Sequence, residues 1–215
     1  DPIHKTRIYL VILGGFIVQY LGGSIIPVFY HLLYHGKTPH WQDIVYFEKG
    51  RYFHSVFLSV LVYGIFICRW FRWPLKKLLD HFAIAAMMMS TIGRIGCFFH
   101  GCCRGKVTQF FCAVRFPDEP HISVHPTQIY MFLCEFAIMI VLFIINANKK
   151  YDSQTFWTGV LIYSMYRFII EFIRTNPLFI YNLTHAQMFS IFTAIWAGSV
   201  IWINRRRLFD GLKDV

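Results

Sequence analysis

The stretch FWTGVLIYSMYRFIIEFIR, residues 156–174, decides the class of fold because it is apolar over a length that crosses a bilayer. Roughly 17–25 mainly apolar residues in a helix span the hydrocarbon of a membrane. The polar residues of this stretch recur at helical spacing, because Tyr163, Arg167, Glu171 and Arg174 fall on one face of a helix. The stretch therefore predicts a membrane helix with a charged stripe.

The remainder of the chain has the same character. Of its 215 residues, 56% are hydrophobic, 19% are aromatic and only 15% are charged, whereas ordinary soluble domains are about 45–50% apolar. Six apolar runs are candidate spans: 8–30, 53–68, 82–100, 127–147, 156–173 and 186–204. We therefore expect an all-α fold, a polytopic membrane helix bundle of about six transmembrane helices. It would form a single domain, 1–215, with a short basic tail at 205–215.

The formal charge of +10 does not indicate nucleic-acid binding, because the basic residues separate the apolar runs instead of forming a solvent-facing patch. They concentrate before the first run and after the second, fourth and sixth runs. These residues are Lys5, Arg7, Arg69, Arg72, Lys76, Lys77, Lys149, Lys150, Arg205, Arg206, Arg207 and Lys213. The positive-inside rule then predicts that both ends of the chain are cytoplasmic, N-in and C-in. The loops 31–52, 101–125 and 174–185 would lie on the opposite side.

Four ionisable residues fall within the predicted spans: Arg94, Glu135, Arg167 and Glu171. Such residues are costly in a membrane unless they are paired or hydrated, so each is a candidate functional residue. Arg167 and Glu171 are one helical turn apart and can pair along the helix. One interpretation is a structural ion pair between packed helices. The other is a cationic wall for an anionic lipid headgroup, since guanidinium groups bind phosphate in a bidentate manner.

Arg94 lies near the outer end of its predicted span, where a single arginine could simply extend to the interface. It is flanked by Gly93 and Gly96, and small residues permit close backbone approach. If the ends of the two helices converge, Arg94 and Arg167 would form a two-arginine phosphate site.

Several polar residues are predicted at the outer interface. His54 opens the second run; it is either a hydrogen-bonded interfacial residue or a general base, because histidine titrates near neutral pH. Pro126 is placed where a helix tolerates proline, at its start. Gln128 and Tyr130 follow it, and a structural cap explains this pattern as well as a binding role does.

Cys97, His100, Cys102 and Cys103 could be read as zinc ligands. The usual zinc signature pairs a C-x-x-C motif with a second, distant pair, and this cluster has no such arrangement. We therefore expect no metal and no cofactor. Neighbouring basic residues would favour a thiolate, so a reactive thiol remains open.

Six segments, in order along the chain, resemble the bacterial prolipoprotein diacylglyceryl transferases. The segment YSMYRFIIEFIR at 163–174 is close to the family's Y-G-x-x-R-F-x-x-E-F-F-R, and HPTQIYMFLCE at 125–135 is similar to H-P-S-Q-L-Y-E-A-L-L-E. The segment at 78–101 resembles the one that ends in the signature G-R-x-G-N-F-x-N-G-E. The other three are GGSIIPVFYHLLYH at 22–35, GRYFHSVFLSV at 50–60 and LTHAQMFSI at 183–191.

The resemblance implies that a diacylglyceryl group moves from phosphatidylglycerol, or a related anionic phospholipid, to the thiol of a lipobox cysteine in a preprotein. By position, Arg94 and Arg167 match the arginines that hold the phosphate, and Glu171 matches the glutamate that orients the second arginine. His54 matches the histidine proposed to deprotonate the thiol, and His100 is a second candidate for proton transfer.

The resemblance also implies substrate-binding positions, a location and a helix count. The positions are Tyr163, Gln128, Tyr130, Glu135, Gly93, Gly96, Cys102 and Cys103. A multi-pass location in the bacterial inner (cytoplasmic) membrane is expected, with membrane lipids around the chain. The family core has seven spans, of which we expect the first to be absent from this chain.

The chain departs from the family pattern at the signature. Cys97, His100 and Cys102 stand where the family has asparagine, asparagine and glutamate, which indicates a divergent branch. Two other functions therefore remain open. One is a non-catalytic, lipid-binding subunit of a membrane complex. The other is a membrane thiol oxidoreductase that uses Cys102 and Cys103.

Overall fold

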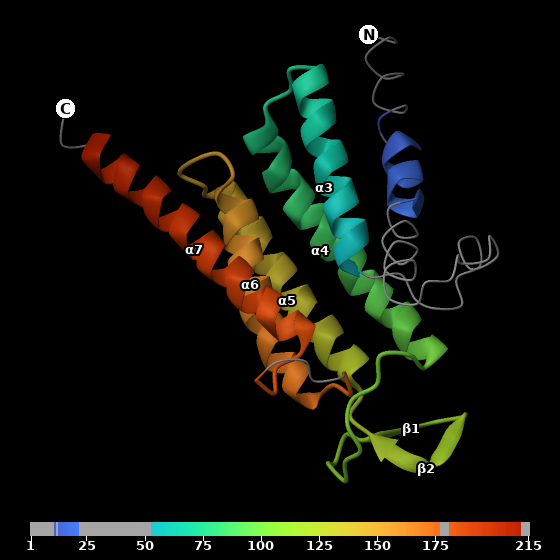
Figure 1. The fold of residues 1–215 in the computed structure, drawn as a ribbon. Coiled ribbons are helices and arrows are strands. Elements are labelled where there is room, and N and C mark those ends of the chain that lie inside the picture. The colour runs from blue at the N-terminus through green and yellow to red at the C-terminus, as the bar shows by residue number, and fades with distance from the viewer. Residues whose placement is uncertain (1–10, 12, 22–52, 177–180, 212–215) are drawn as a thin grey trace. The chain divides into compact units, whose positions relative to one another are not determined.

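The computed structural model describes residues 11, 13–21, 53–176 and 181–211, and these are helical for most of their length (Figure 1). The elements in order are α3 (Phe53–Trp70), α4 (Leu75–His100), β1 (Val114–Phe116), β2 (Glu119–Val124), α5 (Thr127–Ala147), α6 (Gln154–Ile170), the 3-10 helix η1 (Glu171–Ile173) and α7 (His185–Gly211).

Four described helical segments are long and apolar enough to cross a membrane: Leu75–His100, Thr127–Ala147, Gln154–Ile173 and His185–Arg207. They coincide with the last four predicted spans, so the all-α polytopic bundle is confirmed. Helix α3 covers the second predicted span. Its part Ser59–Trp70 is apolar but shorter than the four segments above. Most of the first predicted span, 8–30, lies outside the described residues.

The chain divides into two compact units, Asp1–Leu75 and Lys76–Val215. In the first unit, the Tyr63 hydroxyl of α3 donates a hydrogen bond to the Val11 carbonyl at 2.9 Å. A side chain at Gly14 would collide with that hydroxyl, so glycine permits this close approach. The predicted site residues other than His54 belong to the second unit.

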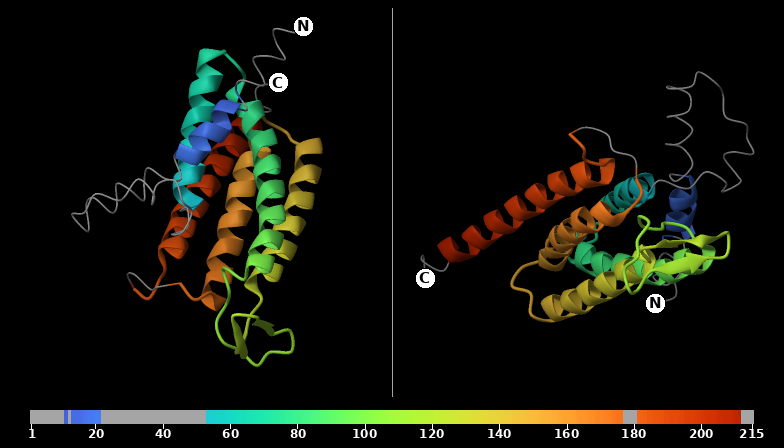
Figure 2. Two further views of the ribbon diagram at one scale, coloured as in Figure 1. Left: turned by 90° about the vertical axis from the view of Figure 1, so that its right-hand side faces the viewer. Right: turned by 90° about the horizontal axis from the view of Figure 1, so that it is seen from below.

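In the second unit, α6 packs against α5 and against α7 (Figure 2). The core is small and consists of Ile84 and Met87 from α4 with Ile138 and Leu142 from α5. Many large apolar side chains face outward instead, such as Leu133 and Phe192, which are 57% and 62% exposed. Helices that are apolar on their outer faces suit a lipid environment.

At one end of this unit, the carboxylate of Asp80 ties α4 to the start of α6. Its Oδ2 atom accepts hydrogen bonds from Lys149 Nζ at 2.9 Å and the Ser153 amide at 3.0 Å, and Oδ1 accepts one from the Phe156 amide at 3.0 Å. Asp80 is completely buried. It therefore satisfies amide groups at the first turn of α6 that have no partner within their own helix.

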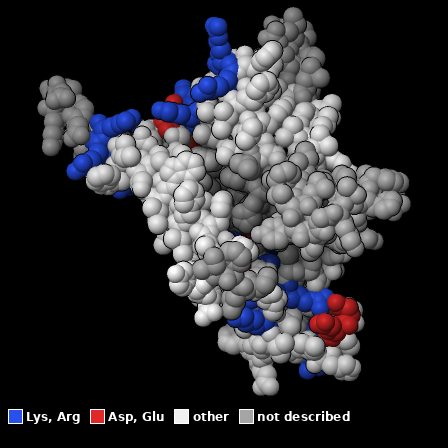
Figure 3. Space-filling model, viewed as in Figure 1, with Lys and Arg blue, Asp and Glu red and all other residues white. Residues whose placement is uncertain are grey.

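Charged side chains are unevenly distributed over the face that Figure 3 shows. Figure 3 shows most lysine, arginine and acidic side chains toward the top and bottom of the view, with a largely uncharged belt between them. This distribution is expected of helices that cross a bilayer.

At the other end, the segment between α4 and α5 contains a β-hairpin that the sequence did not predict. Strands β1 and β2 pair antiparallel, with Val114 opposite Val124 and Phe116 opposite Glu119. The Arg104 guanidinium lies 4.3 Å from the Phe116 ring centroid and 2.5 Å from the Asp118 carboxylate. These contacts fold the hairpin against the loop that follows α4.

Candidate functional site

The first centre of the site is an ion pair between α4 and α5. Arg94 Nη2 lies 3.0 Å from Glu135 Oε1, and Arg94 Nε donates to the same carboxylate at 3.1 Å. Ser90 Oγ and the Tyr166 hydroxyl donate to it at 2.8 and 3.2 Å. Because Glu135 is fully buried and its side chain has these donors, it holds the Arg94 guanidinium in one orientation.

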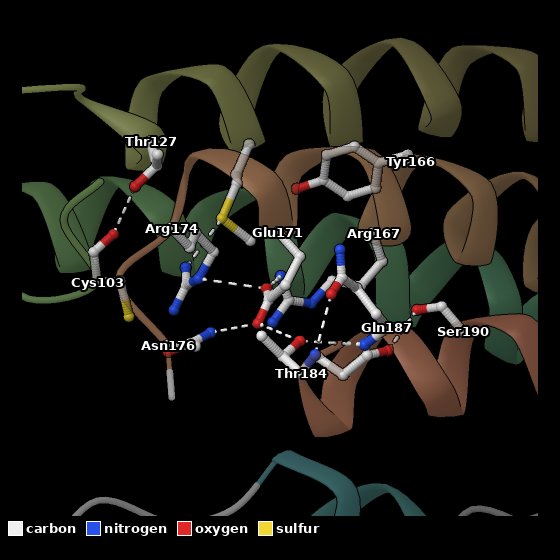
Figure 4. A network of polar contacts seen from close by, with 12 residues as sticks. Cys103, Thr127, Tyr166, Arg167, Glu171, Arg174, Asn176, Thr184, Gln187 and Ser190 are labelled. Atoms are coloured by element: carbon white, nitrogen blue, oxygen red, sulfur yellow. Dashed lines mark hydrogen bonds and ion pairs between the residues drawn. The ribbon is translucent and has the colours of Figure 1, made fainter. Parts of the chain in front are cut away.

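The second centre is the buried carboxylate of Glu171 in η1 (Figure 4). Its Oε2 atom pairs with Arg167 Nη1 at 2.5 Å, so the predicted contact between these residues is present. Its Oε1 atom accepts hydrogen bonds from Thr184 Oγ1 at 3.0 Å and from Asn176 Nδ2. Glu171 therefore joins the end of α6 to the segment that leads into α7.

The start of α7 is fixed by a capping box, in which a threonine and a glutamine three residues later satisfy each other's amides. The Thr184 amide donates to Gln187 Oε1 at 3.0 Å, and the Gln187 amide donates to Thr184 Oγ1 at 3.3 Å. Both residues are buried. The cap thus holds the Thr184 hydroxyl that binds Glu171.

Arg174 adds a third guanidinium beside Glu171. Its Nη1 atom contacts Met131 Sδ at 3.4 Å, while its Nε atom lies 3.7 Å from Glu171 Oε2. That Nε atom is buried and has no hydrogen-bond partner among the described residues. A buried donor without a partner is costly, and a ligand with acceptor oxygens would relieve the cost.

The two centres lie close together around Tyr163. The hydroxyl of this residue interacts electrostatically with Arg94, Arg167 and Arg174 as well as with Glu135. Arg94 and Arg167 therefore both act on Tyr163, and their convergence into one phosphate site stays a prediction. Three guanidiniums face the two carboxylates of Glu135 and Glu171, so the described groups leave one positive charge uncompensated.

The loop after α4 is held against the starts and ends of other helices by backbone hydrogen bonds. The Gly105 amide donates to the His125 carbonyl at 3.0 Å, and the Lys106 amide donates to the Ile173 carbonyl at 2.8 Å. Side chains from α5 hold the preceding residues, because Thr127 Oγ1 donates to the Cys103 carbonyl at 2.6 Å. The loop thus places its cysteines beside Arg174.

The thiols of Cys97, Cys102 and Cys103 gather at this place, with all three sulfur atoms within 4.8 Å of one another. Burial, followed by the neighbouring thiols Cys103 and Cys97, raises the pKa of Cys102 to about 12. Burial also acts to raise the pKa of Cys103, but the guanidinium of Arg174, together with the charge of Arg94, brings it below its ordinary value. Cys103 is therefore the thiol of the three that forms a thiolate most readily.

Two further predicted residues lie at the start of α5. Gln128 is buried, its Nε2 atom donates to the Cys102 carbonyl at 2.6 Å, and its Oε1 atom has no hydrogen-bond partner among the described residues. The Tyr130 hydroxyl instead contacts Cys112 Sγ at 2.9 Å and His125 Nδ1 at 3.3 Å. Gln128 thus borders the thiols, and Tyr130 is engaged with the hairpin side of the loop.

The remaining predicted residues are less engaged. His54 is the second residue of α3, and its side chain lies outside the described residues. His100 is the last residue of α4. Its side chain is exposed and does not belong to the three-sulfur cluster. Gly93 and Gly96 were expected to permit close backbone approach, but no described atom lies within 4 Å of a side chain built at either position.

Sequence reasoning missed several members of the site. Arg174 was assigned only to the helical stripe, and Ser90, Tyr166, Asn176 and Thr184 were not proposed. Only Thr184 carried a usable signal, because Thr184 and Gln187 have the spacing of a capping box. The others become visible only once the rotation of each helix about its axis is known.

The fold and the site define a polytopic helical membrane protein with paired buried carboxylates and an excess of arginine at one end. The model of the family described as prolipoprotein diacylglyceryl transferase matches residues 2–203. The chain belongs to this family.

Among the relatives named phosphatidylglycerol–prolipoprotein diacylglyceryl transferase, three show the range of similarity. The protein of Clostridium tetani is 34% identical over 209 residues, which cover 95% of this chain and 83% of the relative. The protein of Geobacter sulfurreducens is 30% identical over 156 residues, 72% of this chain and 60% of the relative. The protein of Wolbachia pipientis is 31% identical over 177 residues, 78% of this chain and 67% of the relative.

Proposed function

We propose that this chain is a membrane transferase that moves a diacylglyceryl group from phosphatidylglycerol, or a related anionic phospholipid, to the thiol of a lipobox cysteine in a preprotein. The observation that carries the proposal is the cluster of Arg94, Arg167 and Arg174 around two buried carboxylates, with one positive charge left over. The names of the relatives support the same reaction. A bacterial inner membrane is the location that suits these substrates.

In this proposal, Arg94 and Arg167 bind the phosphate of the phospholipid. The C–O bond between the glyceryl carbon and the phosphate breaks, and glycerol phosphate leaves with its negative charge. Guanidinium groups that are already oriented stabilise such charge without reorganising during the reaction. Glu135 orients Arg94, and Glu171 orients Arg167, through the ion pairs described above.

The Arg174 guanidinium contributes a buried Nε donor that makes no hydrogen bond within the described residues. Its buried Nε atom could bind a phosphate oxygen, which would satisfy that atom. His54 or His100 would accept the proton of the acceptor thiol, because an imidazole nitrogen can act as a general base. Tyr163, Gln128, Tyr130, Gly93 and Gly96 would line the space for the substrates.

The test is mass spectrometry of a lipobox cysteine peptide after incubation with purified protein and phosphatidylglycerol vesicles. A mass gain of one diacylglyceryl group is expected with the unmodified chain and is lost in Arg94→Ala and in Arg167→Ala. Arg206→Ala is the matched control, because Arg206 lies near the end of α7 and stacks on Trp202. Retained transfer in both site variants, or no transfer by the unmodified chain, would contradict the proposal.

A further inference from the structure

The three sulfur atoms beside the arginine cluster form a group that the proposed phosphate chemistry does not use. They come from the last turn of α4 and from the loop behind it, and all six cysteines of the chain are free thiols. Their sequence positions, 97, 102 and 103, do not form the usual zinc signature. The fold nevertheless places the sulfurs of Cys97, Cys102 and Cys103 within 4.8 Å of one another.

The backbone of the loop is held in the shape that produces this cluster. Cys103 adopts a left-handed conformation with φ of 61°, which is costly for a residue that is not glycine. The Cys102 amide donates to the Cys97 carbonyl at 3.2 Å, so the chain folds back on the end of α4. Thr127 and Gln128, both buried, bind the carbonyls of Cys103 and Cys102 at 2.6 Å each. The loop is therefore fixed from two sides.

We propose that Cys97, Cys102 and Cys103 bind a divalent ion of the zinc class, with a fourth coordination position open to the thiol of the acceptor. The metal site stands on the geometry of the three sulfurs alone. The role of the open position rests on the function proposed above.

The distances fit such an ion after a small movement. With Zn–S bonds of about 2.3 Å, the sulfurs of a tetrahedral site lie about 3.8 Å apart. The observed limit of 4.8 Å requires the sulfurs to approach by roughly 1 Å at most. Rotation of the cysteine side chains supplies this movement, because all three residues are only partly buried.

The charges around the cluster also fit. Three thiolates and a divalent ion carry a net charge of −1, and a bound acceptor thiolate makes it −2. The positive charges of Arg174 and Arg94 both act electrostatically on Cys103. Hydrogen-bond donors and charges next to the ligands stabilise a metal site and orient its ligands.

Three protein ligands leave the site open, which is typical of catalytic zinc sites and not of structural ones. No fourth histidine, cysteine or carboxylate of the described residues belongs to the cluster. The Gln128 amide beside it has an Oε1 acceptor without a described partner, so a further polar group is available to a bound molecule.

The ion would supply one chemical function, the formation of a thiolate at neutral pH. A thiol that coordinates zinc loses its proton, which passes to solvent or to the phosphate. The thiolate sulfur then attacks the glyceryl carbon that bears the phosphate. An S–C bond forms, the C–O bond breaks, and its electron pair leaves with glycerol phosphate. No atom is oxidised or reduced.

The first test uses the purified full chain, reduced and freed of metal, and titrated with Co²⁺ as a spectroscopic probe. One ion per chain with intense sulfur-to-cobalt charge-transfer absorption is expected. Zn²⁺ should displace the Co²⁺ and abolish that absorption. The affinity should fall at least about tenfold in Cys102→Ser, as loss of a direct ligand costs no less than loss of a supporting residue. Cys134→Ser, an exposed thiol of α5, should bind normally.

Either of two results would overturn the metal site. One is cobalt that binds without the charge-transfer absorption, which would mean that the ligands are not thiolates. The other is binding no stronger than in a Cys97→Ser/Cys102→Ser/Cys103→Ser triple variant.

The second test addresses the open position with the cobalt-loaded chain and a lipobox cysteine peptide. The charge-transfer absorption is expected to rise with this peptide and to stay constant with the same peptide carrying serine. An unchanged spectrum at a peptide concentration that saturates binding would overturn the role of the open position. A rise without diacylglyceryl transfer would instead contradict the proposed function and leave the metal site intact.

Discussion

Arg94 of α4 and Glu135 of α5 form an ion pair across two membrane helices, with Arg94 Nη2 3.0 Å from Glu135 Oε1. The carboxylate is fully buried, while the arginine side chain keeps 16% of its surface exposed. The arginine side chain thus stays partly accessible while its partner is buried. This asymmetry is what a site for an external anion requires, because the buried partner positions the cation and leaves it accessible.

Removing the buried carboxylate should destabilise the protein far more than removing one of its hydrogen-bond donors. Breaking one partner of a buried ion pair costs about 3–5 kcal/mol, which we expect for Glu135→Ala. Tyr166→Phe removes only the 3.2 Å hydrogen bond to Glu135, so about 0.5–1.5 kcal/mol is expected. Unfolding in detergent, followed by circular dichroism, measures both. Equal losses would mean that the carboxylate is not the centre of this network.

Arg167 should be required for transfer, and a lysine at this position should restore the activity only in part. A lysine keeps the positive charge but presents no planar, bidentate group to a phosphate. We expect Arg167→Ala to lower kcat/KM by roughly 100-fold or more, comparable to the loss of one oxyanion donor. Arg167→Lys should retain an intermediate rate, because the charge remains.

The control for Arg167 is stability. Glu171 keeps Thr184 and Asn176 as partners in both variants, so the fold should survive. A rate for Arg167→Lys equal to that of the unmodified chain would show that bidentate binding is unimportant.

Asp80 should matter for stability and not for transfer. It accepts two amide hydrogen bonds at the start of α6 and pairs with Lys149, at the opposite end of the unit from the arginine cluster. Asp80→Ala leaves these buried donors without an acceptor, which should lower the free energy of unfolding by roughly 2–4 kcal/mol. Lys149→Ala should cost less, because only one of the three partners is removed.

The activity of the folded fraction separates the two roles of Asp80. We expect kcat per folded molecule to remain unchanged in Asp80→Ala when transfer is measured below its unfolding temperature. A selective loss of kcat with full stability would place Asp80 in the catalytic machinery instead.

The membrane helices could be predicted from the sequence because bilayer thickness sets a minimum apolar length, and residues 127–147 and 186–204 meet it without any tertiary information. The Arg167–Glu171 contact was also predictable, since it lies within one turn of helix. Helix α6 ends at Ile170, however, before the end of the apolar run. The last residues of the run, Glu171–Ile173, form the 3-10 helix η1.

The partner of Arg94 could not be predicted in the same way. Glu135 lies 41 residues away, and the contact depends on how α4 and α5 are rotated about their axes. The sulfur cluster is likewise a result of the loop, because the left-handed Cys103 turns the chain back on α4. Sequence spacing alone argued against a metal at this place, and the hairpin at 114–124 carried no signal strong enough to predict.

Gly105 should be required for the position of the cysteine loop. A Cβ atom at this position would lie 2.7 Å from both His125 Cβ and Thr127 Cγ2, so Gly105→Ala forces the loop away from the start of α5. Overpacking of this kind costs about 1–3 kcal/mol. Because Thr127 also holds the Cys103 carbonyl, the affinity for Co²⁺ should fall together with the unfolding temperature. Gly198→Ala is the matched control, as nothing lies within 4 Å of its added Cβ, and helix propensity predicts unchanged or higher stability. Normal stability and cobalt affinity in Gly105→Ala would show that the loop adapts without moving the three sulfurs.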